Sequence, residues 1–491
     1  MRLNYRAIVK ILGILTLIEG LFMMPALVVA MYFEEWKSAS TLLTTSIICT
    51  SIGFVILTQL KLQKINLRAR EGYLIAFVSW IYCSLLGAIP LYTCGEGFSL
   101  ISCYFEAVAG FSTTGCTVLD INSVPHSIIF WRSICSWLGG MGILVLLISI
   151  FPLWGINNKA ISSAEAPGTN TRNTEANSTE TGKFLYETYL ILSAIEFILL
   201  VIGPMDWYNA ALTTFNSIST TGLLIQDQAS WMYQLDYVKY IVLIFTILSS
   251  INFLTYFYLY KKRVKEAISN VEVRVYLLTI AIVTVILGLS LRITDTYSTL
   301  WQAFRDALFQ VVSFISTSGY FVSDYSTWPT FCVTLLILLL FVGGCSSSTS
   351  GSLKIIRITI LFKMIKRGIL KQIHPNIVKA VMLDDKTPVT AKSASAVTMH
   401  TLLYFVVLAL GTLLLSFNNF DMETTFTTAL GIFSNTGISL GLPGNSGYYG
   451  MFNEFSQFVM TGLMIAGRLE MYSVVILLLK NFWTPNKTTT L

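Results

Sequence analysis

The chain has 491 residues, of which 54% are hydrophobic and only 12% are charged, and its mean hydropathy is +0.68. Soluble domains carry about 25% charged residues, so the composition excludes an ordinary soluble domain and indicates a polytopic membrane protein. The formal net charge of +6 does not indicate a nucleic-acid partner, because the basic residues are placed as a membrane-topology signal.

Ten stretches are apolar over the roughly 20 residues that a membrane-spanning helix needs. They lie at residues 8–33, 39–60, 71–93, 127–153, 184–203, 236–260, 273–293, 328–366, 397–417 and 454–483. The first stretch is longer than a signal-peptide core and is followed by another span, so we expect no processed signal peptide. A shorter amphipathic segment, too short to cross, follows each of the third, fifth, seventh and ninth spans.

Each of these short segments ends in a hydroxyl-rich strip with a final glycine, which is a fourfold internal repeat. The strips are Ser112-Thr113-Thr114-Gly115, Ser219-Thr220-Thr221-Gly222, Ser316-Thr317-Ser318-Gly319 and Ser434-Asn435-Thr436-Gly437. Irregular backbone at membrane depth needs protein or a water-filled cavity to satisfy its polar groups, so we expect the strips to face one common aqueous axis. Carbonyl oxygens around such an axis can replace the hydration shell of a cation.

The short segments also carry helix-start signals, at Asp206, Asp295 and Asp421. We expect half-helices whose partially negative C-terminal ends face inward and favour a cation. The alternative is that these residues are ordinary caps in surface loops.

These observations predict an all-α polytopic membrane protein. Four pseudo-repeats of helix, pore half-helix, filter strip and helix surround one central pore, and two extra transmembrane helices precede them. The predicted boundaries are 1–66 for the two N-terminal helices, 67–160 for the first repeat, 161–265 for the second, 266–372 for the third with a broken helix, and 373–491 for the fourth.

Most of the 32 Lys and Arg residues fall in loops on the N-terminal side of the membrane, whereas the opposite face holds Lys37, Arg292 and Arg305. The positive-inside rule then predicts that both termini are cytoplasmic. The basic stretch from Lys363 to Lys392 is either a docking surface or ordinary positive-inside decoration. The eight Cys and three His residues lack metal-ligand spacing, and we interpret them as core residues.

Four motifs identify a family resemblance: Phe105 to Gly115, Phe130 to Gly142, Gly343 to Gly351, and Gly467-Arg468-Leu469-Glu470. Through them the chain resembles a TrkH-type subunit of the Trk/Ktr/HKT superfamily of potassium transporters over nearly its whole length. The resemblance implies a homodimer in the lipid of a bacterial cytoplasmic (inner) membrane. It also implies a cytosolic TrkA-type nucleotide-binding ring as the regulatory partner, with the nucleotide bound to that partner only. Potassium would be the transported ion, and no covalently bound cofactor is expected.

The resemblance assigns potassium binding to the last three residues of each strip: Thr113, Thr114, Gly115, Thr220, Thr221, Gly222, Thr317, Ser318, Gly319, Asn435, Thr436 and Gly437. A serine at the first filter glycine goes with sodium permeability in related plant carriers, so four glycines favour potassium. Asn435 departs from the Thr-Thr-Gly pattern. This departure suggests a pore that is not strictly fourfold and is less selective than a tetrameric potassium channel.

Arg468 lies near the middle of the last span, where a charge is costly and usually functional. The resemblance places its side chain in the pore below the filter, as an electrostatic barrier to ions. Two alternatives are an ion pair with Glu470 and a partner on another helix.

A segment rich in Gly and Ser would break the eighth span, and the resemblance makes it an intramembrane gate loop. Its residues are Gly343, Gly344, Ser346, Ser347, Ser348, Thr349, Ser350 and Gly351. A phosphate-binding loop is disfavoured because the Gly-Lys-Ser/Thr ending is absent. Plain helix packing through small residues stays as the alternative.

The sequence therefore predicts potassium uptake through a gated pore and no enzymatic activity. The first alternative is a symporter in which sodium or a proton drives potassium uptake. An intramembrane enzyme is disfavoured, because no metal-ligand cluster, Ser/His/Asp arrangement or carboxylate pair occurs at suitable spacing.

Overall fold

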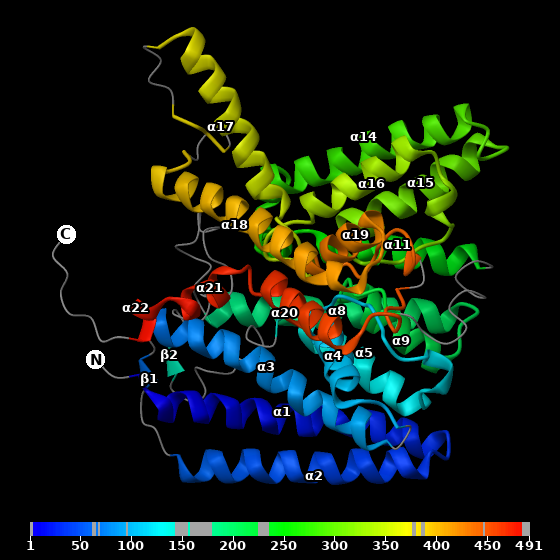
Figure 1. Ribbon diagram of the computed structural model, residues 1–491, viewed down its shortest axis with the longest axis vertical. Coiled ribbons are helices and arrows are strands. Elements are labelled where there is room, and N and C mark those ends of the chain that lie inside the picture. The colour runs from blue at the N-terminus through cyan, green and yellow to red at the C-terminus, as the bar shows by residue number, and fades with distance from the viewer. Residues whose placement is uncertain are drawn as a thin grey trace.

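The computed structural model describes residues 3–60, 65–66, 69–94, 97–142, 156–157, 179–223, 235–375, 380–383, 388–444 and 447–483. Its regular structure is almost entirely helical (Figure 1), so the predicted all-α class is confirmed. The exceptions are β1 (Ile65–Asn66) and β2 (Ile156–Asn157), which have two residues each and pair in parallel.

Two long helices, α1 (Tyr5–Tyr32) and α2 (Trp36–Gln59), lie side by side along one edge of the molecule (Figure 1). Glycines allow them to approach closely: a Cβ atom on Gly13 would lie 2.5 Å from Ile56 Cγ2, and one on Gly53 would lie 2.8 Å from the Gly13 carbonyl oxygen. Small residues are a common means of close packing between membrane helices. The two extra N-terminal helices therefore form one tight hairpin.

This hairpin is tied to the first repeat by Glu35, which lies in the turn between α1 and α2. Its carboxylate accepts hydrogen bonds from the backbone N–H groups of His126 (2.7 Å) and Ser127 (3.0 Å), at the start of α5 (His126–Gly140). The residue before α5 is Pro125, whose side chain makes no cap bond. Because a carboxylate is favoured at a helix N-terminus, the hairpin supplies the cap that α5 lacks.

The rest of the chain contains four units of a long helix, a half-helix, a strip and a second helix. The long helices are α3 (Ala69–Thr93), α8 (Thr179–Ile202), α14 (Val271–Ile293) and α18 (Ala391–Leu415). The half-helices are α4 (Leu100–Phe111), α9 (Trp207–Ile218), α15 (Leu300–Ile315) and α19 (Met422–Phe433). The second helices are α5, α11 (Asp236–Ser250) with α12 (Phe253–Tyr260), α16 (Thr330–Val342) with α17 (Ile355–Ile373), and α20 (Glu454–Arg468) with α21 (Tyr472–Leu478).

Short elements complete the fold: η1 (Ile121–Ser123), α13 (Val264–Ile268), η3 (Tyr325–Thr327), η4 (Ser416–Asn418) and α22 (Lys480–Trp483). The residue boundaries proposed between the repeats stay a prediction.

Among the described residues, six helices are long and apolar enough to cross a membrane: α1, α2, α3, α8, α14 and α18. The spans predicted at 236–260 and 454–483 are each sharply bent, because α11 and α12 meet at 85° and α20 and α21 at 113°. In the first bend the Asn252 side chain accepts from the Leu254 N–H (3.0 Å) and starts a new helix. In the second, Glu470 and Met471 have positive φ angles. Hydropathy reports composition and not chain direction, so it misses such bends.

Two other predicted spans have different outcomes. The break predicted in the eighth span is confirmed, because α16 ends at Val342 and α17 begins at Ile355. The fourth predicted span runs to residue 153, but residues 143–153 lie outside the described residues.

Each half-helix begins at a residue whose side chain caps it, as the start signals predicted. The caps are Ser99, Asp206, Thr299 and Asp421. Asp206 and Asp421 are thus confirmed, but Asp295 is wrong as the start of α15. It lies in the turn after α14 with φ of 52°, and Thr299 accepts from the Gln302 N–H instead.

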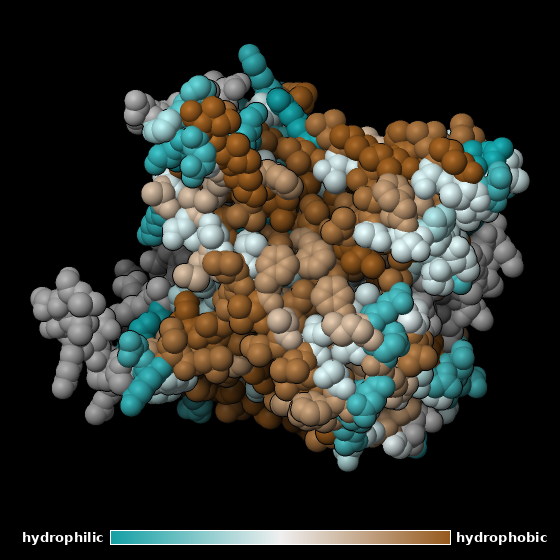
Figure 2. Space-filling model, turned by 45° about the horizontal axis from the view of Figure 1, so that its top comes forward, coloured by the Kyte–Doolittle hydropathy of each residue, from teal (hydrophilic) through white to brown (hydrophobic). Residues whose placement is uncertain are grey.

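The face of the molecule shown in Figure 2 is largely hydrophobic, with hydrophilic residues gathered toward its edges. Exposed apolar side chains on α14, α16 and α18 include Ile282 (56%), Leu338 (53%) and Leu413 (63%). A surface of this size without polar cover is expected where lipid, and not water, is the solvent. The protein is an integral membrane protein.

Candidate ion pathway

Each half-helix ends in the same backbone turn. The N–H of the third strip residue bonds to a carbonyl five residues earlier: Thr114 to Ala109, Thr221 to Asn216, Ser318 to Ser313, and Thr436 to Gly431. The second strip residue is left-handed in all four, with φ of 58° at Thr113, 54° at Thr220, 60° at Thr317 and 56° at Asn435. This is a Schellman motif in which Thr or Asn replaces the usual glycine. A threonine in this region is strained, and such strain persists only where the surroundings fix it.

The four strips form a closed ring through their glycines. A Cβ atom on Gly115 would overlap the carbonyl oxygen of Thr221, one on Gly222 that of Ser318, one on Gly319 that of Thr436, and one on Gly437 that of Thr114. Each glycine thus abuts the next strip, and the fourth abuts the first. The glycines also have positive φ, between 58° and 79°. Close approach and backbone conformation both require glycine here.

The strips are not identical, as the sequence of the fourth suggested. The first and third hydroxyls are paired in strip one (Ser112 and Thr114, 2.7 Å), strip two (2.6 Å) and strip four (2.9 Å). Asn435 donates to Thr114 Oγ1 of the neighbouring strip (3.1 Å) and to the carbonyl of Met464 on α20 (3.0 Å). The carbonyl of Gly437 accepts from the Tyr449 hydroxyl (3.2 Å). The amide of Asn435 therefore links strip four to strip one.

A buried ion pair holds the chain that leaves the first strip. Glu106 (0% exposed) pairs with Arg132 (2%) at 2.5 Å. The same carboxylate accepts hydrogen bonds from Thr117 Oγ1 (2.6 Å) and the Val118 N–H (2.7 Å). Glu106 and Arg132 belong to two of the motifs that carry the family resemblance, but the sequence did not predict that they pair.

We expect Arg132→Leu to destabilise the fold by about 3–5 kcal/mol, because it leaves the carboxylate of Glu106 buried without its cation. The measurement is the unfolding midpoint of the purified protein in detergent. Lys183→Ala is the matched control, since the Lys183–Glu187 pair is exposed at 71% and 51% and should matter little. Equal stability of Arg132→Leu and the parent would contradict this role.

The segment between α16 and α17, Gly343–Lys354, lies directly against two of the strips. The Gly351 N–H bonds to Thr317 Oγ1 at 2.8 Å. A Cβ atom on Gly351 would overlap the carbonyl oxygen of Ser434. The structure thus brings the predicted gate loop together with strips three and four.

The same loop fills the bend between α11 and α12. The Cys345 N–H bonds to the carbonyl of Ser250 (3.1 Å), and the Phe253 N–H bonds to the carbonyl of Ser347 (3.1 Å). Thr349 Oγ1 donates to the carbonyl of Ser249 (3.1 Å). The loop is therefore hydrogen-bonded to the backbone on both sides of the bend between α11 and α12.

A buried carboxylate at the start of α14 anchors the other end of the loop. Glu272 accepts from the N–H (2.5 Å) and hydroxyl (2.8 Å) of Ser346 and from the Asn252 amide (3.0 Å). Within the loop, Ser348 Oγ donates to the Cys345 carbonyl (2.6 Å), and a Cβ atom on Gly344 would overlap the Ser350 hydroxyl. Sequence reasoning did not single out Glu272. Its position as a charged residue in the first turn of an apolar span could have drawn attention to it.

Arg468 joins the loop to the first repeat. Its guanidinium donates to the carbonyls of Thr349, Gly139 and Gly140, each at 2.7 Å. Glu470 pairs instead with Arg357 and with Lys354 (3.2 Å). The alternative of an Arg468–Glu470 pair is therefore wrong, because α20 ends at Arg468 and the turn at Leu469–Met471 sends Glu470 toward α17.

The basic residues on which the predicted orientation depends are only partly described. Lys363 donates to the carbonyls of Met382 (3.0 Å) and Leu383 (2.7 Å), and the end of α17 is exposed. Its role as a docking surface stays a prediction. Other basic residues on the predicted N-terminal side lie outside the described residues: Arg2, Lys61, Lys64, Arg68, Lys159, Arg172, Lys379, Lys386 and Lys487.

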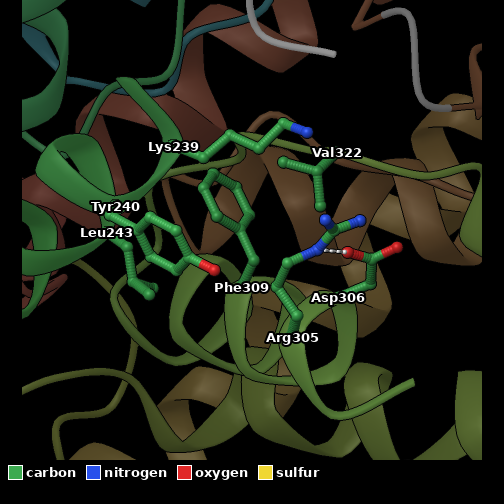
Figure 3. Close-up of a pocket in the computed structure, with 7 residues that line it drawn as sticks. All are labelled: Lys239, Tyr240, Leu243, Arg305, Asp306, Phe309 and Val322. Carbon is green, nitrogen blue, oxygen red and sulfur yellow. Dashed lines mark hydrogen bonds and ion pairs between the residues drawn. The ribbon is translucent and has the colours of Figure 1, made fainter. Parts of the chain in front are cut away.

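A small surface pocket between α11 and α15 lies apart from the ring residues (Figure 3). Arg305 Nε bonds to Asp306 Oδ1 (2.8 Å) and Arg305 Nη1 lies 3.4 Å from Asp236, while Lys239 lies 3.1 Å from Asp236. Its cationic and acidic groups therefore pair with one another. The pocket shares no residue with the strips or the loop.

Comparison with known proteins places this geometry in a family. The family described as "TrkH: Cation transport protein" matches residues 38–486. The "Trk system potassium uptake protein TrkH" of Halomonas elongata is 31% identical over 98% of this chain and 100% of that protein. The TrkG protein of Escherichia coli K12 is 30% identical over 98% of this chain and 99% of that protein.

The crystal structure of the potassium transporter TrkH from Vibrio parahaemolyticus has a TM-score of 0.87 to this structure and a sequence identity of 26%. The alignment covers 98% of this chain and 100% of that one. The match extends over both the N-terminal hairpin and the four repeats. The chain therefore belongs to the TrkH family of cation transport proteins.

Proposed function

We propose that this chain conducts potassium ions across the bacterial cytoplasmic membrane through one pore formed by the four strips. The closed ring carries the proposal, because each glycine abuts a carbonyl oxygen of the next strip. Carbonyl oxygens held in such a ring can take the place of an ion's water shell. Potassium is favoured over sodium by the four glycines and by the names of the relatives, which are potassium uptake proteins.

The Gly343–Lys354 loop would be the gate. Three groups of contacts support this role: its bond to Thr317 beside the ring, its anchor on Glu272, and the bonds of Arg468 to its Thr349 carbonyl. Each of these hydrogen bonds contributes about 0.5–3 kcal/mol, so the loss of a few of them can shift the balance between a closed and an open loop. Removing one anchor should then favour the open state.

The assembly would be a homodimer with both termini in the cytoplasm, surrounded by membrane lipid and regulated by a cytosolic TrkA-type nucleotide-binding ring. The relatives belong to a named Trk system, which implies more than one component. On this chain the exposed basic residues Lys366, Arg367 and Lys371 on α17 support a cytosolic docking surface. The nucleotide would bind to the ring and not to this chain.

We expect Glu272→Ala to raise rubidium flux in the absence of a cytosolic partner, because Ser346 and Asn252 lose their shared acceptor and the loop loses an anchor. One lost hydrogen bond changes an equilibrium by about 2–10-fold, and this substitution removes three, so we expect an increase of about tenfold or more. Glu266→Ala is the control, since Glu266 lies in α13 with its side chain 51% exposed. Flux equal to that of the parent, in a folded variant, would place the gate elsewhere.

The test of the proposed function is rubidium and sodium flux into liposomes that contain the purified protein. We expect rubidium to enter down its gradient, faster than sodium, without an imposed pH gradient. Uptake that requires a sodium or proton gradient would instead support the symporter alternative. Absence of rubidium flux under both conditions from the parent and from Glu272→Ala, with both proteins verified in the membrane, would reject the proposal.

A further inference from the structure

Glu196 is a fully buried carboxyl on α8, a helix with one exposed apolar side and one buried side. Ile191 (58% exposed), Ile195 (45%) and Ile198 (53%) cover its outer side, whereas Tyr189 and Glu196 are both 0% exposed on the inner side. A carboxyl at such a site is costly and usually functional. The role of Glu196 is not explained by the ring, the loop or Arg468.

Its contact leads directly to the second strip. Ser217 Oγ donates to Glu196 Oε1 at 2.6 Å. The carbonyl of the same Ser217 accepts the N–H of Thr220 (3.0 Å), the left-handed strip residue. Glu196 therefore fixes Ser217, whose carbonyl accepts a hydrogen bond from the strained turn of strip two.

Strip two differs from the other strips at this point. The residues that correspond to Ser217, five before the glycine, are Gly110, Phe314 and Ile432. None of them has a side-chain hydroxyl, so the hydrogen bond from this position to a carboxyl is specific to strip two.

Strip two also contacts the chain that leaves strip three. A Cβ atom on Gly222 would lie 3.0 Å from the nitrogen of Tyr320, the residue after Gly319. A change in the position of strip two would therefore be felt at the end of strip three.

We propose that Glu196 is a positioning residue of the ring, which fixes the end of α9 through Ser217 and thereby tunes the preference of the pore for potassium over sodium. The inference rests on the proposed function. A strained turn keeps its conformation only while its surroundings define it, and selectivity depends on where the carbonyls are held. Loss of the contact should change relative permeability more than total flux.

The test measures potassium-to-sodium permeability ratios in liposomes for Glu196→Leu, Glu196→Gln and Ser217→Ala. We expect Glu196→Leu and Ser217→Ala each to lower the ratio about threefold to tenfold, the range that one lost hydrogen bond gives. Combining them should add little, because both remove the same contact. Glu196→Gln keeps an acceptor oxygen for Ser217 and should restore the parent ratio.

Glu19→Leu is the matched control, because Glu19 is also buried (2% exposed) but lies on α1 in the N-terminal hairpin. It should leave the ratio unchanged. An unchanged ratio in folded Glu196→Leu or Ser217→Ala would overturn the inference, and so would a Glu196→Gln ratio as low as that of Glu196→Leu. If Gly115→Ser lowers the ratio while the Glu196 variants do not, only this inference fails. A parent without potassium preference would overturn the proposed function as well.

Discussion

Gly115→Ser is expected to lower the preference for potassium over sodium by about tenfold or more, a change of about 1.4 kcal/mol or more in relative barrier height. A Cβ atom at this position would overlap the carbonyl oxygen of Thr221, which belongs to the next strip. The φ of Gly115 is 79°, which side chains rarely adopt. The strip must therefore shift, and the carbonyl of Thr221 must shift with it.

The measurement is the ratio of rubidium to sodium flux in liposomes, with Gly97→Ser as the control. Gly97 has nearly the same φ, 77°, but a Cβ atom there would meet no atom within 4 Å. Gly97→Ser thus has the same unfavourable positive φ for a side chain as Gly115→Ser, but it causes no clash with a neighbouring strip. If both variants keep the parent ratio, the ring is not the selectivity filter.

Arg468→Ala is expected to increase ion flux by two effects that act in the same direction. A fixed positive charge 4 Å from a passing cation repels it by about 4 kcal/mol at an effective dielectric constant of 20, before screening by water. The substitution also removes the bonds from the guanidinium to the carbonyls of Thr349, Gly139 and Gly140, which hold the loop to α5. The potassium preference should stay largely intact, because the ring residues are unchanged.

Arg468→Lys separates the two effects, because lysine keeps the charge but cannot reproduce the fork of donors. Single-channel recording gives the conductance, which reports the charge, and the open probability, which reports the loop. We expect Arg468→Lys to raise open probability without raising conductance, and Arg468→Ala to raise both. A lower conductance together with loss of folded Arg468→Ala protein would show that the residue is structural and not a barrier.

Local sequence determined the elements of the pathway. The caps at Asp206 and Asp421 start two half-helices, and four glycine-ended strips terminate all four. These signals act over a few residues of the chain, through backbone hydrogen bonds and the steric freedom of glycine, so they are readable without the fold. The break after Val342 was readable for the same reason.

Only the tertiary structure decided how these elements meet. The bends at Asn252 and Glu470 lie in stretches that are apolar enough to pass as straight spans. The loop bonds to the backbone at the first bend, and Lys354, which precedes α17, pairs with Glu470 at the second. Arg468 was readable as a costly charge, but its three carbonyl partners come from segments more than 100 residues away.

The same limit applies to the buried carboxylates. Glu106, Glu196 and Glu272 were visible in the sequence as acidic residues in or beside apolar spans, but their partners Arg132, Ser217 and Ser346 became known only from packing. A sequence pattern records the desolvation cost of a charge, whereas the compensating contact depends on which distant segment the fold brings within hydrogen-bond distance. The closed ring is the clearest case, because no strip by itself specifies its neighbour.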